Sequence, residues 1–202
     1  MNGMRDNSAI PDTIFLLIII NGLTFACQQF FPGLIDQYFA LWSFNSYRSD
    51  FMLWQLVTYG FLHGNTTHIL FNMFMLWMFG RELEGIMGPR NFLIYYLTCV
   101  VGAGIVQLII ASLQGGQYAT VGASGGVFGL LLAFGMAFPN RVVMLLFPPI
   151  PMKAKYLVIL AGLLELYFGV SGTNPGIANF AHLGGMLFGF LLINYWKQQR
   201  SG

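Results

Sequence analysis

TVGASGGVFG, residues 120–129, places the hydroxyl group of Ser124 among glycine and alanine residues, where a polar loop turns into a long apolar helix. The loop covers residues 114–119, and the helix is predicted to end near Pro139. A serine is a weak nucleophile unless a base lies beside it. The function of this stretch therefore depends on which polar residues the rest of the fold brings to it.

The composition of the chain is that of a membrane protein. Of its 202 residues, 56% are hydrophobic and 8% are charged, whereas about a quarter of the residues in a soluble domain are charged. A helix needs about 20 apolar residues to cross a bilayer. We predict an all-α, polytopic membrane protein, with one domain at residues 13–196 between a polar N-terminal tail, 1–12, and a C-terminal tail, 197–202. Six apolar stretches are its expected transmembrane helices: 13–31, 62–79, 92–113, 123–139, 154–170 and 176–196.

The basic residues predict the orientation of these helices. Lys and Arg favour the cytoplasmic side in the short loops of membrane proteins. In a six-helix topology only Arg48 falls on one side, and the other side holds Arg5, Arg81, Arg90, Arg141, Lys153, Lys155, Lys197 and Arg200. Both termini are therefore expected in the cytoplasm. Because the net charge of +2 reflects this sidedness, no surface for nucleic acid is predicted, and nothing in the sequence indicates a metal or a cofactor.

Polar residues are predicted at one depth on three of the helices. His68 and Asn72 are four residues apart and share a face of the second helix, whereas His63 is expected to cap that helix. His68 and His182 each lie about six residues into their helices, so at 1.5 Å per residue both are expected roughly 10 Å below the external surface. Ser124 can join them only if the loop before the fourth helix is sunk into the bundle, which the glycines of that loop allow.

Small residues predict which helices touch. Gly125 and Gly129 in the fourth helix form a small-xxx-small pair, and so do Gly185 and Gly189 in the sixth. Small residues let membrane helices approach closely. We expect these two helices to be in contact, which brings the serine of the fourth towards the histidine of the sixth.

Two further features concern the outer half of the molecule. Glu165 is an acid within the fifth helix, where a charge is costly and is a functional candidate. A hydrogen bond from a neighbouring hydroxyl, amide or backbone group to Glu165 would also explain why an acid is found in this helix.

The external segment 32–59 carries aromatic residues with scattered charges, which is typical of a segment in the headgroup layer. We expect this segment to dip into the outer leaflet.

Together the polar residues favour acyl transfer. Each has a simpler explanation alone: Ser124 as a helix cap, His182 as a buried core residue, Asn72 as a contact between helices. Their common depth instead predicts a nucleophile, Ser124, and a general base, His182. No third, acidic member is required, so a dyad is expected. The side chains of His68 and Asn72 and the backbone N–H of Ser124 are expected to bind the oxyanion.

These residues resemble the motifs of the rhomboid family of intramembrane serine proteases. Residues 122–125 match the GxSG motif of the family, and residues 181–185 match the AHxxG motif of its sixth helix. The second-helix pattern H-x4-H-x3-N is matched by His63, His68 and Asn72.

One further position departs from the pattern of the family and another matches it. Many members carry Trp-Arg in the first loop, where this chain has Trp54 and Gln55. Phe128 occupies the position of the aromatic residue that stacks on the catalytic histidine.

The resemblance runs over residues 54–189 and implies a six-helix, bacterial-type core. It implies cleavage of a transmembrane helix of another membrane protein within the lipid bilayer, in the bacterial cytoplasmic membrane, with the site towards the extracytoplasmic side. The fifth helix and the loop after it, residues 163–176, would form a lateral gate. Two alternatives remain: a catalytically silent rhomboid-like protein that binds helices, and a small transporter, which should show inverted repeats that the sequence lacks.

Overall fold

The computed structural model describes residues 12–145, 149–173 and 178–201 and is mostly helical. Within these residues, six helices are longer than 12 residues: α1 Asp12–Phe30, α4 Thr66–Met87, α5 Pro89–Gln114, α6 Ser124–Ala137, α7 Ala154–Ser171 and α8 Asn179–Ser201. Each overlaps one predicted apolar stretch. Three helices, α1, α5 and α7, are long and apolar enough to cross a membrane, and α6 is a shorter apolar helix. The predicted tail 1–12 lies almost wholly outside the described residues.

Local residue chemistry sets the ends of these helices. The side chain of Asn65 accepts a hydrogen bond of 2.8 Å from the backbone N–H of His68, so Asn65 is the N-cap of α4. The prediction that His63 caps this helix was wrong: His63 is buried, and its ring packs edge-on against that of His68. Asn65 directly precedes the first helical residue, Thr66, so its side chain reaches the first turn, whereas His63 lies two residues further back.

The segment between α1 and α4 folds into short elements. They are α2 Leu34–Phe39, β1 Leu41–Trp42, α3 Gln55–Thr58 and the 3-10 helix η1 Tyr59–Phe61. β1 pairs in antiparallel fashion with β2, Ala119–Thr120, just before α6, and Leu41 is opposite Thr120. The segment therefore braces the chain that leads to Ser124. Several of its large apolar side chains are exposed, among them Phe44, Tyr47, Leu53 and Trp54.

A second hairpin connects α6 to α7. β3, Val142–Met144, pairs with β4, Pro151–Lys153. The prolines at positions 148, 149 and 151 predict a rigid turn over residues 147–151, and of these residues 147 and 148 lie outside those that the structure describes.

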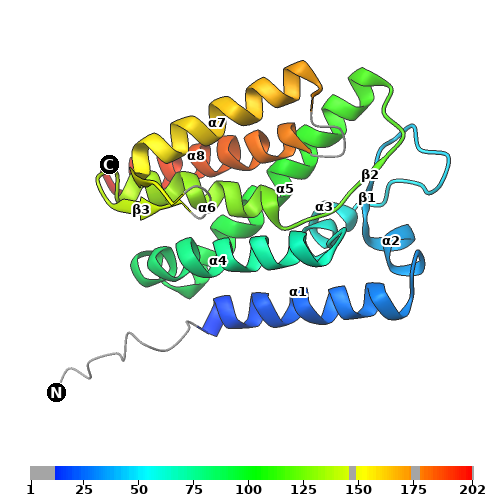
Figure 1. The fold of residues 1–202 in the computed structure, drawn as a ribbon, viewed down its shortest axis with the longest axis horizontal. Helices are drawn as coiled ribbons and strands as arrows, with labels where there is room; N and C mark the ends of the chain where they lie inside the picture. Colours follow the sequence, from blue (N-terminus) through cyan, green and yellow to red (C-terminus); the bar gives the residue numbers. More distant parts are fainter. Residues whose placement is uncertain (1–11, 146–148, 174–177, 202) are drawn as a thin grey trace.

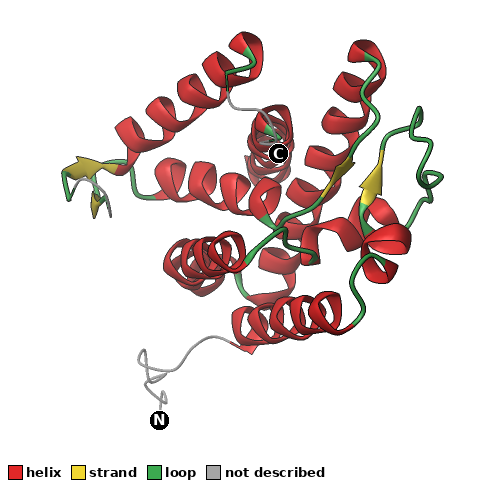
Figure 2. Ribbon diagram, turned by 45° about the vertical axis from the view of Figure 1, so that its right-hand side comes forward, coloured by secondary structure: helices red, strands yellow, loops and turns green. Residues whose placement is uncertain are grey.

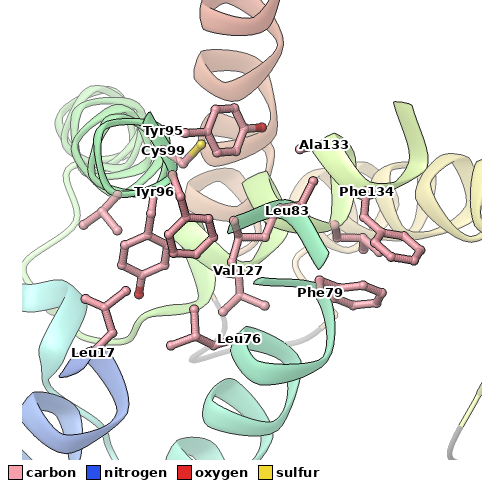
Figure 3. Packing of buried hydrophobic residues seen from close by; sticks show 14 of the residues in the cluster. Leu17, Leu76, Phe79, Leu83, Tyr95, Tyr96, Cys99, Val127, Ala133 and Phe134 are labelled. Carbon is pink, nitrogen blue, oxygen red and sulfur yellow. The ribbon is translucent and has the colours of Figure 1, made fainter. Parts of the chain in front are cut away.

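Helix α8 lies inside the bundle and packs against α5, α6 and α7, whereas α1 and α7 lie at opposite edges (Figures 1 and 2). The buried cluster joins α4, α5 and α6 around Phe79, Tyr95, Tyr96, Cys99 and Phe134 (Figure 3). Figure 1 also shows that α1 begins and α8 ends at the same end of the bundle.

Candidate active site

Ser124 is the first residue of α6, and α6 begins inside the bundle. α5 has 26 residues and α6 has 14, and the chain after α5 runs back along the bundle before α6 starts (Figure 1). The backbone N–H of Gly122 donates to the carbonyl of Tyr59 at 2.9 Å, which fixes this returning chain. The sunken loop required by the sequence analysis is therefore present.

Gly122 is required at its position for two reasons. Its φ of +129° is one that residues with a side chain rarely adopt. A Cβ there would also lie 2.7 Å from Cε1 of His68. Glycine thus lets the His68 ring approach the serine.

Helix α8 brings His182 to the serine through contacts between backbones. A Cβ on Gly185 would overlap the carbonyl group of Gly125, and a Cβ on Gly129 would lie 3.2 Å from the carbonyl oxygen of Gly185. The helices α6 and α8 are therefore as close as their backbones allow. At this separation Nε2 of His182 lies 2.7 Å from Oγ of Ser124.

The ring of Phe128 stacks on the imidazole of His182. The two ring centroids are 4.3 Å apart and the planes differ by 5°. Phe128 lies one turn after Ser124 on α6, so one helix supplies both the nucleophile and the surface that holds the plane of the base.

The two residues predicted to bind an oxyanion occupy different positions. His68 lines the same cavity as Ser124. Asn72 is buried, and its amide donates to the backbone carbonyl of His68 at 3.1 Å. Asn72 does not line the cavity described here. The N–H of Ser124 begins the helix and makes no intrahelical hydrogen bond, so it is free to donate to a ligand.

A cavity of about 700 Å³ adjoins the serine and the histidine. Its wall includes exposed residues at the start of α4 and the end of α5, among them Asn65 and Gln114, so the cavity reaches the surface. Gln107 also lines it and donates to the hydroxyl of Tyr118 at 3.2 Å. A cavity of this size has room for both water and part of a peptide, and its polar groups can form hydrogen bonds with either.

The structure places an acid against the histidine, where the sequence analysis expected a pair complete without one. Oε2 of Glu165 on α7 lies 3.0 Å from Nδ1 of His182. The same oxygen accepts a hydrogen bond of 2.6 Å from the side-chain amide of Asn179. Asn179 precedes His182 by three residues, and this spacing could have placed it on the same helix face. The sequence does not fix which face α7 turns towards α8, so Glu165 could not be assigned.

Gln55 holds the first loop in the position where many rhomboid proteins carry arginine. It is fully buried. Its Oε1 accepts from the N–H of Trp42 at 3.3 Å, and its Nε2 donates to the carbonyls of Tyr38 and Asp50 at 3.4 and 3.3 Å. A glutamine can both donate and accept, whereas arginine can only donate. The amide therefore suits this loop, which offers one donor and two acceptors.

Known proteins match most of the chain. The family model described as the rhomboid domain matches residues 50–198. "Rhomboid protease GlpG" of Yersinia pestis (strain Pestoides F) is 31% identical over 164 residues, covering 79% of this chain and 53% of that protein. "Putative rhomboid protease YdcA" of Bacillus subtilis (strain 168) is 34% identical over 141 residues, covering 69% of this chain and 65% of that protein. "RHOMBOID-like protein 4" of Arabidopsis thaliana is 33% identical over 157 residues, covering 74% of this chain and 37% of that protein.

The chain spans about half the length of the GlpG relatives that it matches. The matched model nevertheless includes the serine, the histidine and all the long helices after α1. Because it covers well over half of the sequence, the chain belongs to the rhomboid family.

Proposed function

We propose that this protein is an intramembrane serine endopeptidase that cleaves peptide bonds in or near transmembrane helices of other membrane proteins. Ser124 is the nucleophile and His182 the general base. The observation that carries the proposal is the 2.7 Å contact between Oγ of Ser124 and Nε2 of His182 beside a cavity of about 700 Å³. An isolated cap or core histidine would need no such cavity.

The reaction proceeds in two acyl transfers. As Oγ of Ser124 attacks the peptide carbonyl carbon, its proton passes to Nε2 of His182. The C–N bond then breaks, and the amine leaves with that proton, which gives an acyl-serine. Water from the cavity attacks the acyl carbon and gives its proton to Nε2. Release of the carboxyl product returns the proton to Oγ.

Donors on α4 and α6 bind the oxyanion that forms in each step. The backbone N–H of Ser124 points from the start of α6, and the ring of His68 lies beside Gly122. Asn72 has a second amide N–H besides the one bonded to the carbonyl of His68. We expect Asn72→Ala to slow cleavage by up to about 10² without abolishing it. A fully active Asn72→Ala variant would assign this residue to packing.

The site lies within the thickness of the membrane. At 1.5 Å per residue the 14 residues of α6 span about 21 Å, less than the roughly 30 Å of a bilayer core. With Arg141 and the end of α6 at the cytoplasmic face, Ser124 therefore lies below the opposite surface. We place both termini in the cytoplasm of a bacterial cell, all six long helices across the inner membrane, and the site towards the extracytoplasmic side.

A fluorophosphonate probe tests the nucleophile directly. The purified wild-type protein in detergent should be labelled on serine, and Ser124→Ala and His182→Ala should lose labelling by at least about 10³-fold with little change in thermal stability. The matched control is Ser112→Ala, because Ser112 on α5 is exposed and bonds only its own helix at Leu108. Cleavage of a reconstituted helix substrate should likewise be retained by wild type and Ser112→Ala and lost by Ser124→Ala and His182→Ala. A folded but unlabelled wild type would instead indicate a silent, helix-binding protein.

A further inference from the structure

We propose that Glu165 is a positioning residue for His182, so that the base of the proposed active site depends on an acid carried by α7. This inference rests on the proposed function. Its geometric basis is the distance of 3.0 Å between Oε2 of Glu165 and Nδ1 of His182. The side chain of Glu165 is 14% exposed and that of His182 is 10% exposed.

The role of the base decides where the proton of the neutral imidazole must be. Nε2 has to accept the serine proton, so the ring hydrogen must be on Nδ1. A buried Nδ1–H requires an acceptor, and the carboxylate of Glu165 is the acceptor in reach. When Nε2 is protonated during the reaction, the same carboxylate stabilises the imidazolium.

The contact in the resting structure is close but not aligned. Nδ1 of His182 is buried and makes no well-directed hydrogen bond, although Oε2 lies 3.0 Å away. Contacts in unliganded active sites are often misaligned and improve when substrate binds. A small rotation of the Glu165 side chain, or a small shift of α7, is enough to direct Nδ1–H at the oxygen.

Phe128 and Glu165 restrict the histidine in different ways. The stacked ring of Phe128 fixes the plane of the imidazole. Stacking does not distinguish one tautomer from the other, because both present the same flat face. An acceptor in the plane of the ring at Nδ1 supplies this second restriction, as in other serine hydrolases where an acid orients the histidine.

Asn179 keeps the carboxylate beside the histidine. Its Nδ2 donates to Oε2 of Glu165 at 2.6 Å, and Asn179 itself is buried. Both partners of the carboxylate therefore come from one face of α8. A purely structural role for Glu165, in which it only ties α7 to Asn179, makes a different prediction, because a neutral glutamine would keep that tie.

The test compares Glu165→Gln with wild type by the pH dependence of fluorophosphonate labelling. Glutamine keeps the size and the oxygen that accepts from Asn179 but removes the charge. We expect labelling at the plateau to fall about 10- to 100-fold. The acid limb of the profile should move to lower pH, because the carboxylate no longer stabilises the imidazolium. His68, which lines the same cavity as His182, is present in both proteins and cancels in the comparison.

Two variants complete the experiment. Glu165→Asp keeps the negative charge but holds it further from His182. Its labelling rate and the position of its acid limb should therefore lie between those of wild type and those of Glu165→Gln. Glu84→Gln applies the same change to a buried carboxylate at the far end of α4 and should match wild type. If wild type is labelled and Glu165→Gln has the wild-type rate and profile, the positioning role is wrong and the proposed function stands. If wild type is not labelled at all, the proposed function itself is wrong.

Discussion

The α6–α8 pair and the helix α7 are held in the bundle by opposite means. In the pair, the backbones of Gly125 and Gly185 touch, and α8 also packs closely on α5 through Gly102 and Phe188. Half of the residues in the most apolar window of α5 are buried, against 11% of those in α7. Among the described residues of α7 only Ala154 is buried, and α7 stands at the edge of the bundle (Figure 2).

This difference separates the parts of the proposed catalytic machinery. Ser124 and His182 come from helices whose separation is fixed by contacts that no side chain can relax. Glu165 comes from α7, which packs against α6 and α8 mainly through side chains and of whose described residues only Ala154 is buried. The distance from nucleophile to base is therefore built into the fold, whereas the contact between base and acid can respond to movement of α7.

The largest effect is expected from a methyl group placed in the tight contact. Gly185→Ala puts a Cβ against the carbonyl group of Gly125, which is backbone and cannot rotate away. Overpacking of this kind costs about 1–3 kcal/mol or more. A displacement of Ser124 by about 1 Å can reduce the rate about 10²-fold. Unfolding in denaturing detergent and the rate of probe labelling measure both effects.

The same change in α7 is the matched control. A Cβ on Gly162 would meet only the flexible end of Met186, at 3.7 Å. Gly162→Ala should therefore leave activity unchanged and stabilise the helix by about 0.5–1 kcal/mol. Equal destabilisation by the two substitutions would contradict the distinction between a tight pair and a loosely held helix.

The sequence was sufficient to predict the tight pair. Hydropathy located the long helices, the spacing of Gly125, Gly129, Gly185 and Gly189 indicated close approach, and Ser124 and His182 followed from the chemistry of the motif. These features depend on residue type and on period along one helix. The resemblance to the rhomboid family, which came from the same residues, is confirmed by the matched family model.

The contacts of α7 and of the first loop were not predictable in this way. Which face of α7 meets α8 depends on packing between helices, so the sequence left Glu165 between a functional and a structural interpretation. The strands β1 and β2 have two residues each and carry no periodic pattern. Gln55 was identified only as a departure from Trp-Arg, because its three partners are backbone groups whose positions require the fold.

The first loop provides an intermediate case, in which one side chain binds rigid backbone groups. Gln55→Ala would leave the buried N–H of Trp42 without its partner, at about 1–3 kcal/mol for an unsatisfied buried group. Gln55→Arg should also destabilise this chain, because arginine cannot accept from that N–H. Thermal unfolding and limited proteolysis within residues 41–54 measure the change. Gln117→Ala, at an exposed glutamine, is the control, and unchanged proteolysis in Gln55→Ala would show that the loop has other anchors.

The smallest effect is expected where α8 holds the acid of α7. Asn179→Ala removes the 2.6 Å hydrogen bond to Oε2 of Glu165 but keeps the carboxylate within reach of His182. Because one uncharged donor to a charged acceptor contributes about 1.5–3 kcal/mol at most, and part of this is recovered by water in the adjoining cavity, we expect labelling to slow only about two- to fivefold.

Asn179→Asp replaces the amide donor at this position by a second acid. It places a second carboxylate beside that of Glu165, and two like charges at this distance cannot both ionise without a large penalty. The pair therefore takes up one proton and keeps a single negative charge beside His182, so this variant should keep the acid limb of wild type and not that of Glu165→Gln. Asn91→Ala, which loses an exposed hydrogen bond from the first turn of α5 to the carbonyl of Met87 at the end of α4, controls for the loss of an amide. If Asn179→Asp instead has the acid limb of Glu165→Gln, a negative charge beside His182 is not what sets that limb.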